Sequence, residues 1–479
     1  MEKKLSRRLF LRNVGLGATM AALAGCAPKV VEVTKIVEKE VEKVVQQTVV
    51  VEKEKVVEKE KVVQQTVVVE KQVEVKAPEP KGSVEFWGHD QHPLDLAAEG
   101  FVKKYPTVKW ESPHPAERGT KLRAALAAGS GCPDLYWAEA TEAQELGCND
   151  LLTILDDWLI PVKDDYHPAK LAETFIAKTG HYTGWPGDLS VSGYYYRWDI
   201  YEKLGYKDVD WDNLTYDEFY KMSGDIAKKG YYTLCAPQGW TALWYYAMHQ
   251  VGGTAVSKDG QKLLMNTPEG IEAMKIVKGL YDCGGGLDTG WWSAPYWAAI
   301  QEGKLIGDIA AAWVKGFWEA QIKTPDKGMG YWKIAPFPGG GAVKYRTGIW
   351  GGAQIINPKC SVNKENAILY MQYALGSLEG AALCGGWGII PSYRPYLNSS
   401  LFLKLRSPVT GDFPLNEFWA KQEKQLSPNF FRPAGWGATA DALAATMPKI
   451  MKGELTVEQG MAEIEKLVLP DFERSKCKI

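Results

Sequence analysis

Short alternating segments and longer segments with helical periodicity follow one another through the body of the chain. Residues 83–87 alternate apolar and polar positions as a strand does, and residues 94–104 repeat apolar positions with the period of an amphipathic helix. Residues 108–110 predict a second strand, 118–128 a second helix and 134–137 a third strand. This β-α-β-α-β order predicts an α/β fold with a mostly parallel sheet flanked by helices.

Aromatic and acidic residues stand where the first and third predicted strands end. Trp87, His89 and Asp90 follow the first strand, and Trp137 and Glu139 end the third. Ligands of such sheets gather beyond the carboxyl ends of the strands, so these residues are candidates for a binding site. A helix N-cap for Asp90 and a first-turn carboxylate for Glu139 are the structural alternatives.

The N-terminal segment has the features of an export signal. Residues 6–12 contain paired arginines, and residues 14–25 are small and apolar but too few to span a bilayer as a helix. The arginine pair resembles a twin-arginine signal, and residues 23–26, Leu-Ala-Gly-Cys, resemble the lipobox of bacterial lipoproteins. We therefore expect residues 1–25 to be a signal peptide, and Cys26 to bear a lipid that anchors the exported protein to the outer face of the cytoplasmic membrane.

A repetitive segment follows the signal. Residues 43–53 recur unchanged as residues 61–71, and residues 27–81 contain no glycine, aromatic residue or cysteine. The Val, Glu and Lys spacing permits partial heptads, the dense β-branched residues suit extended strands, and the low complexity also suits a disordered tether. We interpret residues 26–81 as a lipid-anchored Val/Glu/Lys repeat stalk, with coiled coil and disorder both left open.

The overall composition describes a globular protein with a balanced charge. Of 479 residues, 46% are hydrophobic and 24% are charged, which excludes a disordered or collagen-like chain. The formal net charge of −2 gives no support to nucleic-acid binding through bulk charge. The partners that this composition favours are neutral or small.

Many weak motifs, taken in order, resemble one family. Residues 194–205 are similar to a Tyr-Tyr-Asn-Lys-Asp-x-x-x-Lys-x-Gly crossover, with Arg197 and Trp198 in place of the usual Asn-Lys. Residues 266–270, Asn-Thr-Pro-Glu-Gly, resemble a Ser-Pro-Glu helix start with a threonine N-cap. The remaining matching segments are 84–87, 101–106, 121–134, 151–158 and 303–318. Together they resemble the extracellular solute-binding proteins of bacterial ABC importers, in the carbohydrate-binding group that includes maltose-binding protein.

This resemblance implies a two-lobed periplasmic-binding-protein-like fold, each lobe a mostly parallel sheet flanked by helices, with a cleft and hinge between them. We expect lobe 1 to comprise residues 82–190 and about 340–395, and lobe 2 to comprise 191–339 and about 396–479. The resemblance also implies a receptor that binds a small solute in the cleft, closes on it, and delivers it to ABC permease subunits.

A sugar site needs flat aromatic platforms together with carboxylates, amides and arginines for the hydroxyl groups. The chain has 19 tryptophans, and each of them also has core packing as a structural alternative. Trp436 lies where maltose-binding relatives place a stacking tryptophan, and Asp188 precedes the first apparent crossing between lobes, where a turn is its alternative role. The predicted ligand-binding residues are Trp436, Trp318, Trp87, Trp137, Trp350, Trp240, Asp90, Glu139 and Asp188.

The motifs of catalysis and metal binding are missing from the sequence. It contains no Gly-x-Ser-x-Gly, no His-Glu-x-x-His and no phosphate-cradling Gly-Lys-Ser/Thr, so we expect no enzyme activity, no catalytic residue, no metal and no cofactor. Two alternatives stay open: the same fold binding a quaternary ammonium or other cationic solute in an aromatic cage, and a cell-surface glycan hydrolase. Apart from Cys26 there is an odd number of cysteines, so at least one is unpaired in a monomer, and Cys132–Cys148 is one possible pair.

Overall fold

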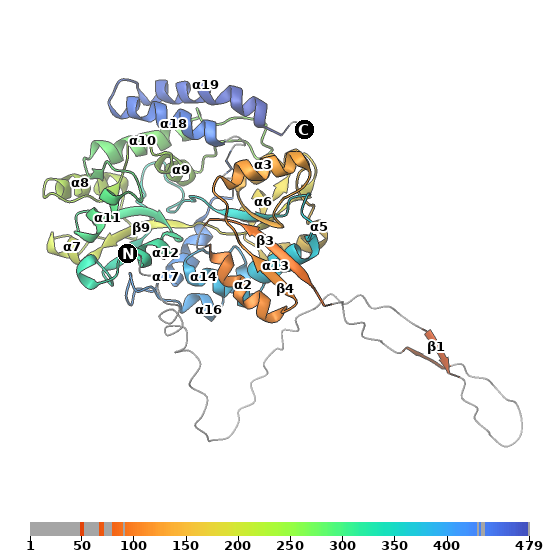
Figure 1. Ribbon diagram of the computed structural model, residues 1–479. Coiled ribbons are helices and arrows are strands. Elements are labelled where there is room, and N and C mark those ends of the chain that lie inside the picture. Colours follow the sequence, from red (N-terminus) through yellow and green to blue (C-terminus); the bar gives the residue numbers. More distant parts are fainter. Residues whose placement is uncertain are drawn as a thin grey trace, which may run out of the picture. The chain divides into compact units, whose positions relative to one another are not determined.

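The structure is a computed structural model, shown in Figure 1, in which the N-terminal segment and the body form separate units, residues 1–78 and 79–479. The described residues are 48–51, 67–70, 79–89, 92–428, 431–432 and 436–477, with the side chains of 48–51, 67–70 and Trp436 excepted. In the first unit, β1 (Thr48–Val51) pairs antiparallel with β2 (Val67–Glu70). Each strand comes from one copy of the repeat, so the β-branched residues take the extended form there. The signal peptide and Cys26 lie outside the described residues.

A five-stranded sheet with the order β4-β3-β5-β14-β8 forms the framework of the first lobe. Its strands are β3 (Gly82–Trp87), β4 (Val108–Glu111), β5 (Leu135–Glu139), β8 (Gly184–Pro186) and β14 (Ala353–Ile356). β3 runs parallel to β4 and to β5, whereas β14 runs antiparallel to β5 and to β8. The strands and helices predicted between residues 83 and 137 are confirmed to within two residues.

Helices cover this sheet, and a small hairpin lies at its edge. The helices are α2 (Pro93–Lys104), α3 (Arg118–Ala128), α4 (Ala140–Cys148), α5 (Asp156–Leu159), η2 (Ile160–Asp165), α6 (Pro168–Glu173), α13 (Lys364–Gly376) and α14 (Leu378–Trp387). The hairpin consists of β6 (Phe175–Ile176) and β7 (His181–Tyr182). α2, α13 and α14 pack on one another.

The second lobe is built on a three-stranded sheet with the order β12-β9-β13. Its strands are β9 (Ser192–Arg197), β12 (Gly307–Ala311) and β13 (Trp332–Ala335), and a separate parallel pair is formed by β10 (Leu234–Cys235) and β11 (Gly286–Leu287). β12 and β13 both run antiparallel to β9, so the prediction of a mostly parallel sheet is wrong for this lobe. Several helices lie between these strands in the sequence. Alternating strands and helices predict parallel pairing only where a single helix crossover joins the two strands that pair.

The second lobe is mostly helical. Its helices are α7 (Trp198–Lys203), α8 (Tyr216–Ala227), α9 (Thr241–Gln250), α10 (Pro268–Asp282), α11 (Ala294–Gln301), α12 (Val314–Gln321), η3 (Pro325–Lys327), α15 (Arg394–Leu397), α16 (Ser400–Leu403), α17 (Leu415–Gln422), η4 (Glu423–Gln425), α18 (Trp436–Met451) and α19 (Val457–Ser475). At the start of α10, Thr267 accepts a hydrogen bond from the Gly270 amide at 3.2 Å and Pro268 takes the first helical position, as its motif predicted. α18 and α19 lie side by side against α10 (Figure 1).

Each lobe has its own hydrophobic core. The largest buried cluster surrounds the three-stranded sheet and includes Trp244, Trp318 and Trp332. Separate buried clusters pack on the five-stranded sheet, one around Phe86 and the other around Leu122. Because the cores are separate, the lobes can move relative to each other about the segments that join them.

The chain passes between the lobes at residues 187–191, 349–352 and 388–393, which we call the crossing segments. Asp188 ties two of them together, because its carboxylate accepts hydrogen bonds from the Ser190 amide at 3.0 Å, the Ser190 hydroxyl at 2.6 Å and the Ile390 amide at 2.9 Å. This is the turn role that the sequence left as the alternative for Asp188.

Two disulfides are formed by cysteines far apart in the sequence. Cys132 pairs with Cys360 within the first lobe, and Cys148 at the end of α4 pairs with Cys477, which follows α19. The pair Cys132–Cys148 considered from sequence is therefore wrong; the two cysteines are close in the chain, but each reaches a partner that only the fold brings near. Cys235, Cys283 and Cys384 are in no disulfide. None of the helices in the described ranges is both long and apolar enough to cross a bilayer.

Candidate functional site

A polar cavity of about 530 Å³ lies beyond the carboxyl ends of β3 and β4, beside Tyr136 near the start of β5. We call it the polar cradle. Its lining residues are Gly88, His89, His114, Pro115, Ala116, Glu117, Arg118, Gly119 and Tyr136. The cradle is where the strand order predicted a binding site.

Hydrogen bonds and unusual backbone angles hold the cradle in shape. The ring of His114 accepts from the Gly88 amide at 3.0 Å through Nδ1, and its Nε2 lies 2.7 Å from an Asp95 carboxylate oxygen. His114 and Glu117 have positive φ angles of 42° and 54°, a region that residues other than glycine rarely adopt. Such angles persist only where surrounding contacts fix them, and they cluster at binding sites.

Arg118 begins α3 and supplies the positive charge of the cradle. Its guanidinium lies 5.7 Å from the centre of the Tyr136 ring, a cation–π distance. Tyr136 in turn donates to Glu142 at 3.3 Å, and burial raises the pKa of Tyr136 to about 12, so the hydroxyl stays protonated. The cradle thus offers a cation, imidazoles and a carboxylate, a donor and acceptor set that suits hydroxyl groups.

Partly exposed aromatic rings gather on the second lobe and at the crossing segments, and we call them the aromatic wall. Its members are Trp240, Trp291, Trp292, Trp313, Phe317, Trp350 and Trp387. Their ring centres follow one another at contact distances: Trp350–Trp240 6.4 Å, Trp240–Trp291 4.9 Å, Trp291–Trp292 4.8 Å, Trp292–Trp313 6.0 Å, Trp292–Phe317 4.8 Å and Phe317–Trp387 5.2 Å. Faces of this kind stack on apolar C–H surfaces and also attract cations.

The wall and the cradle meet at Trp387. This residue ends α14 of the first lobe, and its ring contacts Phe317 of the second lobe. On its other side, the ring of His89 in the cradle lies 6.5 Å away. Aromatic rings of both lobes therefore meet next to polar groups of the first lobe, an arrangement that suits a hinged receptor.

Two predicted residues belong to the aromatic wall, and three others lie on β3 and β5 outside the cradle lining. Trp240 and Trp350 belong to the wall. Glu139 has a side chain that is 49% exposed at the end of β5, and its carboxylate lies 3.5 Å from the Arg432 guanidinium. Trp87 and Trp137, at 9% and 7% exposure, present only an edge to the surface.

Two predicted residues are placed away from solvent. Trp318 is fully buried, packs on Tyr195 and Trp332, and donates from its indole to the Tyr296 hydroxyl at 3.3 Å. The prediction that Trp318 binds ligand is therefore wrong. The neighbouring residue on α12, Phe317, is 37% exposed and faces outward instead. Asp188 is buried, and its carboxylate is hydrogen-bonded to Ser190 and Ile390 of the crossing segments. Burial raises its pKa.

The remaining predictions lie outside the described residues: Asp90, the side chain of Trp436, and the lipid-bearing Cys26. The structure also adds residues that sequence reasoning missed. These are Trp291, Trp292, Trp313 and Phe317 of the wall, with His114 and Arg118 of the cradle. The adjacent pair Trp291-Trp292 in a short polar connection was the one sequence signal that pointed to them, because an aromatic pair outside a periodic segment has no predicted core to fill.

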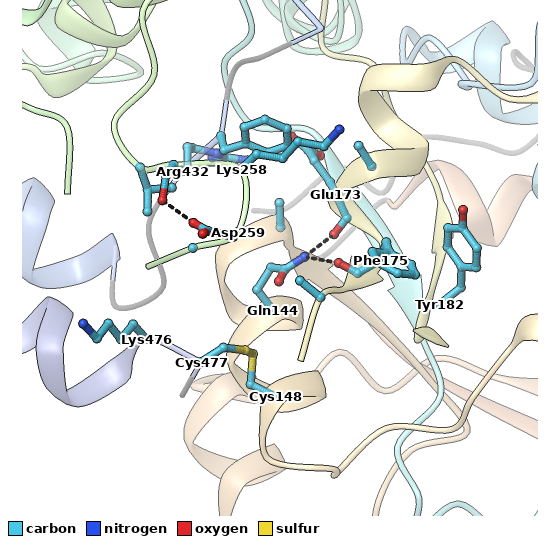
Figure 2. Close-up of a pocket in the computed structure, with 17 residues that line it drawn as sticks. Gln144, Cys148, Glu173, Phe175, Tyr182, Lys258, Asp259, Arg432, Lys476 and Cys477 are labelled. Atoms are coloured by element: carbon cyan, nitrogen blue, oxygen red, sulfur yellow. Dashed lines mark hydrogen bonds between the residues drawn. A yellow bond between two sulfur atoms is a disulfide. The ribbon is translucent and has the colours of Figure 1, made fainter. Parts of the chain in front are cut away.

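A second cavity, of about 690 Å³, is shown in Figure 2. It is lined by α4 and the β6–β7 hairpin from the first lobe, and by residues 256–260, Phe431, Arg432 and the C-terminal Lys476-Cys477. Gln144 points into it and donates to the carbonyl oxygens of Glu173 at 2.9 Å and Phe175 at 3.1 Å. No tryptophan lines this cavity, so the wall is the better candidate for a stacking site.

Comparison with known proteins decides the family. The model of the bacterial extracellular solute-binding proteins matches residues 91–377. The chain belongs to this family. The lactose-binding protein of Rhizobium radiobacter is 24% identical over 278 residues, which cover 54% of this solute-binding protein and 61% of that relative. The match therefore spans somewhat less than two thirds of the relative's length.

Solved structures with the same fold cover nearly the whole body. The ABC transporter associated binding protein of B. animalis subsp. lactis, in complex with β-1,6-galactobiose, has a TM-score of 0.69 at 19% identity and covers 83% of this chain and 99% of its own. The sugar-binding protein MalE of Xanthomonas citri has a TM-score of 0.67 at 18% identity, with 82% and 98% covered. At these identities the likeness establishes the two-lobed periplasmic-binding-protein fold. No group of metal-binding side chains was found among the residues with described positions.

Proposed function

We propose that this solute-binding protein captures a mono- or oligosaccharide between its lobes and delivers it to the permease of an ABC importer. The observation that carries the proposal is that the aromatic wall reaches the polar cradle through Trp387, whose ring lies 5.2 Å from that of Phe317 in the second lobe and 6.5 Å from that of His89 in the cradle. Indole faces cover the apolar face of a sugar ring, while Arg118, His89 and Glu139 match its hydroxyl rim. The sugars named for the relatives and the solved structures support the same class of solute.

The mechanism is reversible binding coupled to lobe closure, without covalent chemistry. A solute that touches Arg118 of the first lobe and Trp292 of the second makes both contacts only when the lobes are closed. Binding therefore shifts the open–closed equilibrium by the difference in its affinity for the two forms. The closed shape of the protein then distinguishes the solute-bound form from the free form when it meets the permease.

Attachment to the membrane is part of this proposal. The lipobox-like residues 23–26 support a diacyl anchor on Cys26, and the repeat stalk would keep the body above the bilayer. A Cys26→Ser variant tests it directly. We expect the variant to leave the membrane fraction for the medium or periplasm, and retention in the membrane fraction would contradict the anchor.

Isothermal titration calorimetry of residues 79–479 with galactosides, maltooligosaccharides and choline-like amines tests the solute class. We expect a saccharide to bind, and Trp292→Ala and Arg118→Ala each to weaken it about tenfold or more, equivalent to about 1.4 kcal/mol. Trp198→Ala is the matched control, because Trp198 starts α7 and its ring contacts Tyr331 and Lys333, which do not belong to the wall.

The other outcomes separate the alternatives. Binding of amines alone would favour the alternative in which the wall binds a cationic solute, since aromatic faces also bind quaternary ammonium groups. Release of hydrolysed sugar during the titration, abolished by removing a carboxylate, would identify a glycan hydrolase.

A further inference from the structure

A buried carboxylate stands behind the aromatic wall. Asp308 lies on β12 with no exposed surface. Its carboxylate accepts hydrogen bonds from the Trp291 indole at 2.8 Å, the Tyr296 hydroxyl at 2.9 Å, the Cys235 amide at 3.2 Å and its neighbour's amide at 3.0 Å. A buried carboxylate is costly unless it is fully hydrogen-bonded, so these donors are arranged around the charge.

Trp291 connects this carboxylate to the surface of the wall. The indole is partly exposed, and its ring contacts those of Trp240 at 4.9 Å, Trp292 at 4.8 Å and Trp313 at 6.0 Å. The next residue, Trp292, has a positive φ of 66°, which is strained for a large side chain. A turn of this kind keeps its geometry only if neighbouring contacts fix it, and the bond between Trp291 and Asp308 is such a contact.

We propose that Asp308 is a positioning residue of the solute site: its carboxylate holds the Trp291 indole, and through it the adjoining rings, in the orientation on which the solute stacks. The proposal rests on the proposed function only in taking the wall as the solute surface. Asp308 itself has no access to solute. Trp318, which donates to Tyr296 from the interior, belongs to the same network and so acts behind the wall.

The charge of Asp308 gives this role a pH signature. Burial raises the pKa of Asp308 to about 7. The titratable groups that face it come from the elements packed around it: Cys235 on β10, Tyr296 on α11, Tyr194 on β9 and Tyr246 on α9. When Asp308 gains a proton, one of its two oxygens carries a hydrogen and faces groups that are themselves donors. The hydrogen bond from the Trp291 indole to Asp308 then weakens.

Protonation therefore has opposite effects on binding and on folding. The folded pKa lies above the ordinary value of 3.8, so this group stabilises the fold fully at low pH, and the stabilisation is lost as the pH rises through about 7. Solute affinity changes in the other direction, and rises as the carboxylate becomes charged. A purely structural carboxylate would show the folding effect alone.

The test is a double-mutant cycle in the soluble body, residues 79–479, with binding measured between pH 5.5 and 8.5. We expect the wild type to bind saccharide several-fold more tightly at pH 8 than at pH 5.5. Asp308→Asn should weaken binding about tenfold at pH 8 and flatten the pH profile. In a Trp291→Phe background, Asp308→Asn should have no further effect on affinity, because the group through which it acts is already gone.

Controls and a ligand-free measurement keep the outcomes distinct. Asp282→Asn removes an exposed carboxylate on α10 that accepts from Lys278, and should leave affinity and pH profile unchanged. The fluorescence difference between wild type and Trp291→Phe should titrate near pH 7, and this titration should disappear in Asp308→Asn. If Asp308→Asn fails to fold, Trp291→Phe alone must still flatten the pH profile of binding.

Equal losses from Asp308→Asn with and without Trp291 would overturn the positioning role, as would a fluorescence titration that persists in Asp308→Asn. If no saccharide binds at any pH, the proposed function fails. The fluorescence titration then still decides whether Asp308 controls the Trp291 indole.

Discussion

Replacing Cys148 and Cys477 with serine removes the disulfide that joins the two lobes, whereas replacing Cys132 and Cys360 removes one that lies within the first lobe. Cys148 ends α4, which packs on the first-lobe core, and Cys477 follows α19, whose apolar face belongs to the core of the second lobe. Figure 2 shows the Cys148–Cys477 bond at the edge of the larger cavity. The two disulfides are therefore a matched pair that differs mainly in what each one connects.

The two disulfides are expected to contribute almost equally to stability. They join residues separated by 228 and 329 positions, and in the chain-entropy model the stabilisation grows with the logarithm of that length, so the two differ by only about 0.3 kcal/mol. Loss of a native disulfide costs about 2–5 kcal/mol. Both double-serine variants should therefore unfold at similar, lower temperatures.

Their effects on lobe movement should differ. A disulfide keeps its Cα atoms within about 7 Å, and α19 ends two residues before Cys477, so the chain there can extend by about 7 Å at most. While the disulfide is present, α4 and the C-terminal end of α19 can move apart only as far as the disulfide and these two residues allow. Removing the bond allows a wider opening, whereas removing Cys132–Cys360 does not.

Spin labels on one exposed residue of α3 and one of α18, with distances measured by pulsed electron resonance, report the opening. We expect a longer and broader distance distribution only in the Cys148→Ser, Cys477→Ser variant without solute, and calorimetric unfolding should show similar losses in both variants. An unchanged distance distribution in that variant, or the same broadening in the Cys132→Ser, Cys360→Ser control, would refute the hypothesis that the Cys148–Cys477 disulfide limits lobe opening.

Three further predictions concern close contacts and charges. Gly316→Ala places a methyl group 2.8 Å from both the ring and the backbone carbonyl oxygen of Trp387, so it should displace Trp387, weaken solute binding in calorimetry and lower the melting temperature; unchanged affinity would mean that Trp387 can shift without loss of the site. Lys170→Met leaves the buried Glu173 carboxylate without its ion-pair partner and should lower the free energy of unfolding by about 3–5 kcal/mol in urea, whereas the double change to Met and Gln should recover much of the loss. Burial lowers the pKa of His249 to about 4, so its contribution to stability is present above its ordinary value of 6.5 and is lost as the pH falls toward 4. Melting temperatures between pH 4 and 7 should show this loss, and a His249 variant that melts with the same pH slope would contradict it.

Periodicity predicted the start of the first lobe well because the elements there follow one another with short connections. Residues 83–137 alternate strands and helices at lengths that pattern alone resolves, and proline and glycine mark where they end. The second lobe was less predictable because β9 pairs with strands more than a hundred residues away. Strand direction at that distance depends on how the intervening helices pack, and no local pattern records it.

The candidate site was predicted only in part for a related reason. Trp318 and Phe317 are neighbours on α12, and a helix turns by about 100° per residue, so choosing the wrong one exchanges the buried face for the exposed face. Trp291 and Trp292 lie in a connection without periodicity, where only the fold reveals that Asp308 is behind them. Composition indicated that stacking surfaces exist, and the tertiary structure determined which tryptophans form them.

The position of the wall relative to the hinge explains how solute contact can drive closure. Trp350 precedes Gly351 and Gly352, which have positive φ angles of 78° and 79°, and β14 of the first lobe begins immediately after them. The Trp313 indole donates to the Trp350 carbonyl at 3.0 Å, which fixes Trp350 to the second lobe. The wall therefore moves as one body with the second lobe, except for Trp387 on α14. Because Trp387 alone approaches from the first lobe, its contact with Phe317 is the part of the wall that opening must break, and a solute stacked across the two rings would stabilise the closed form.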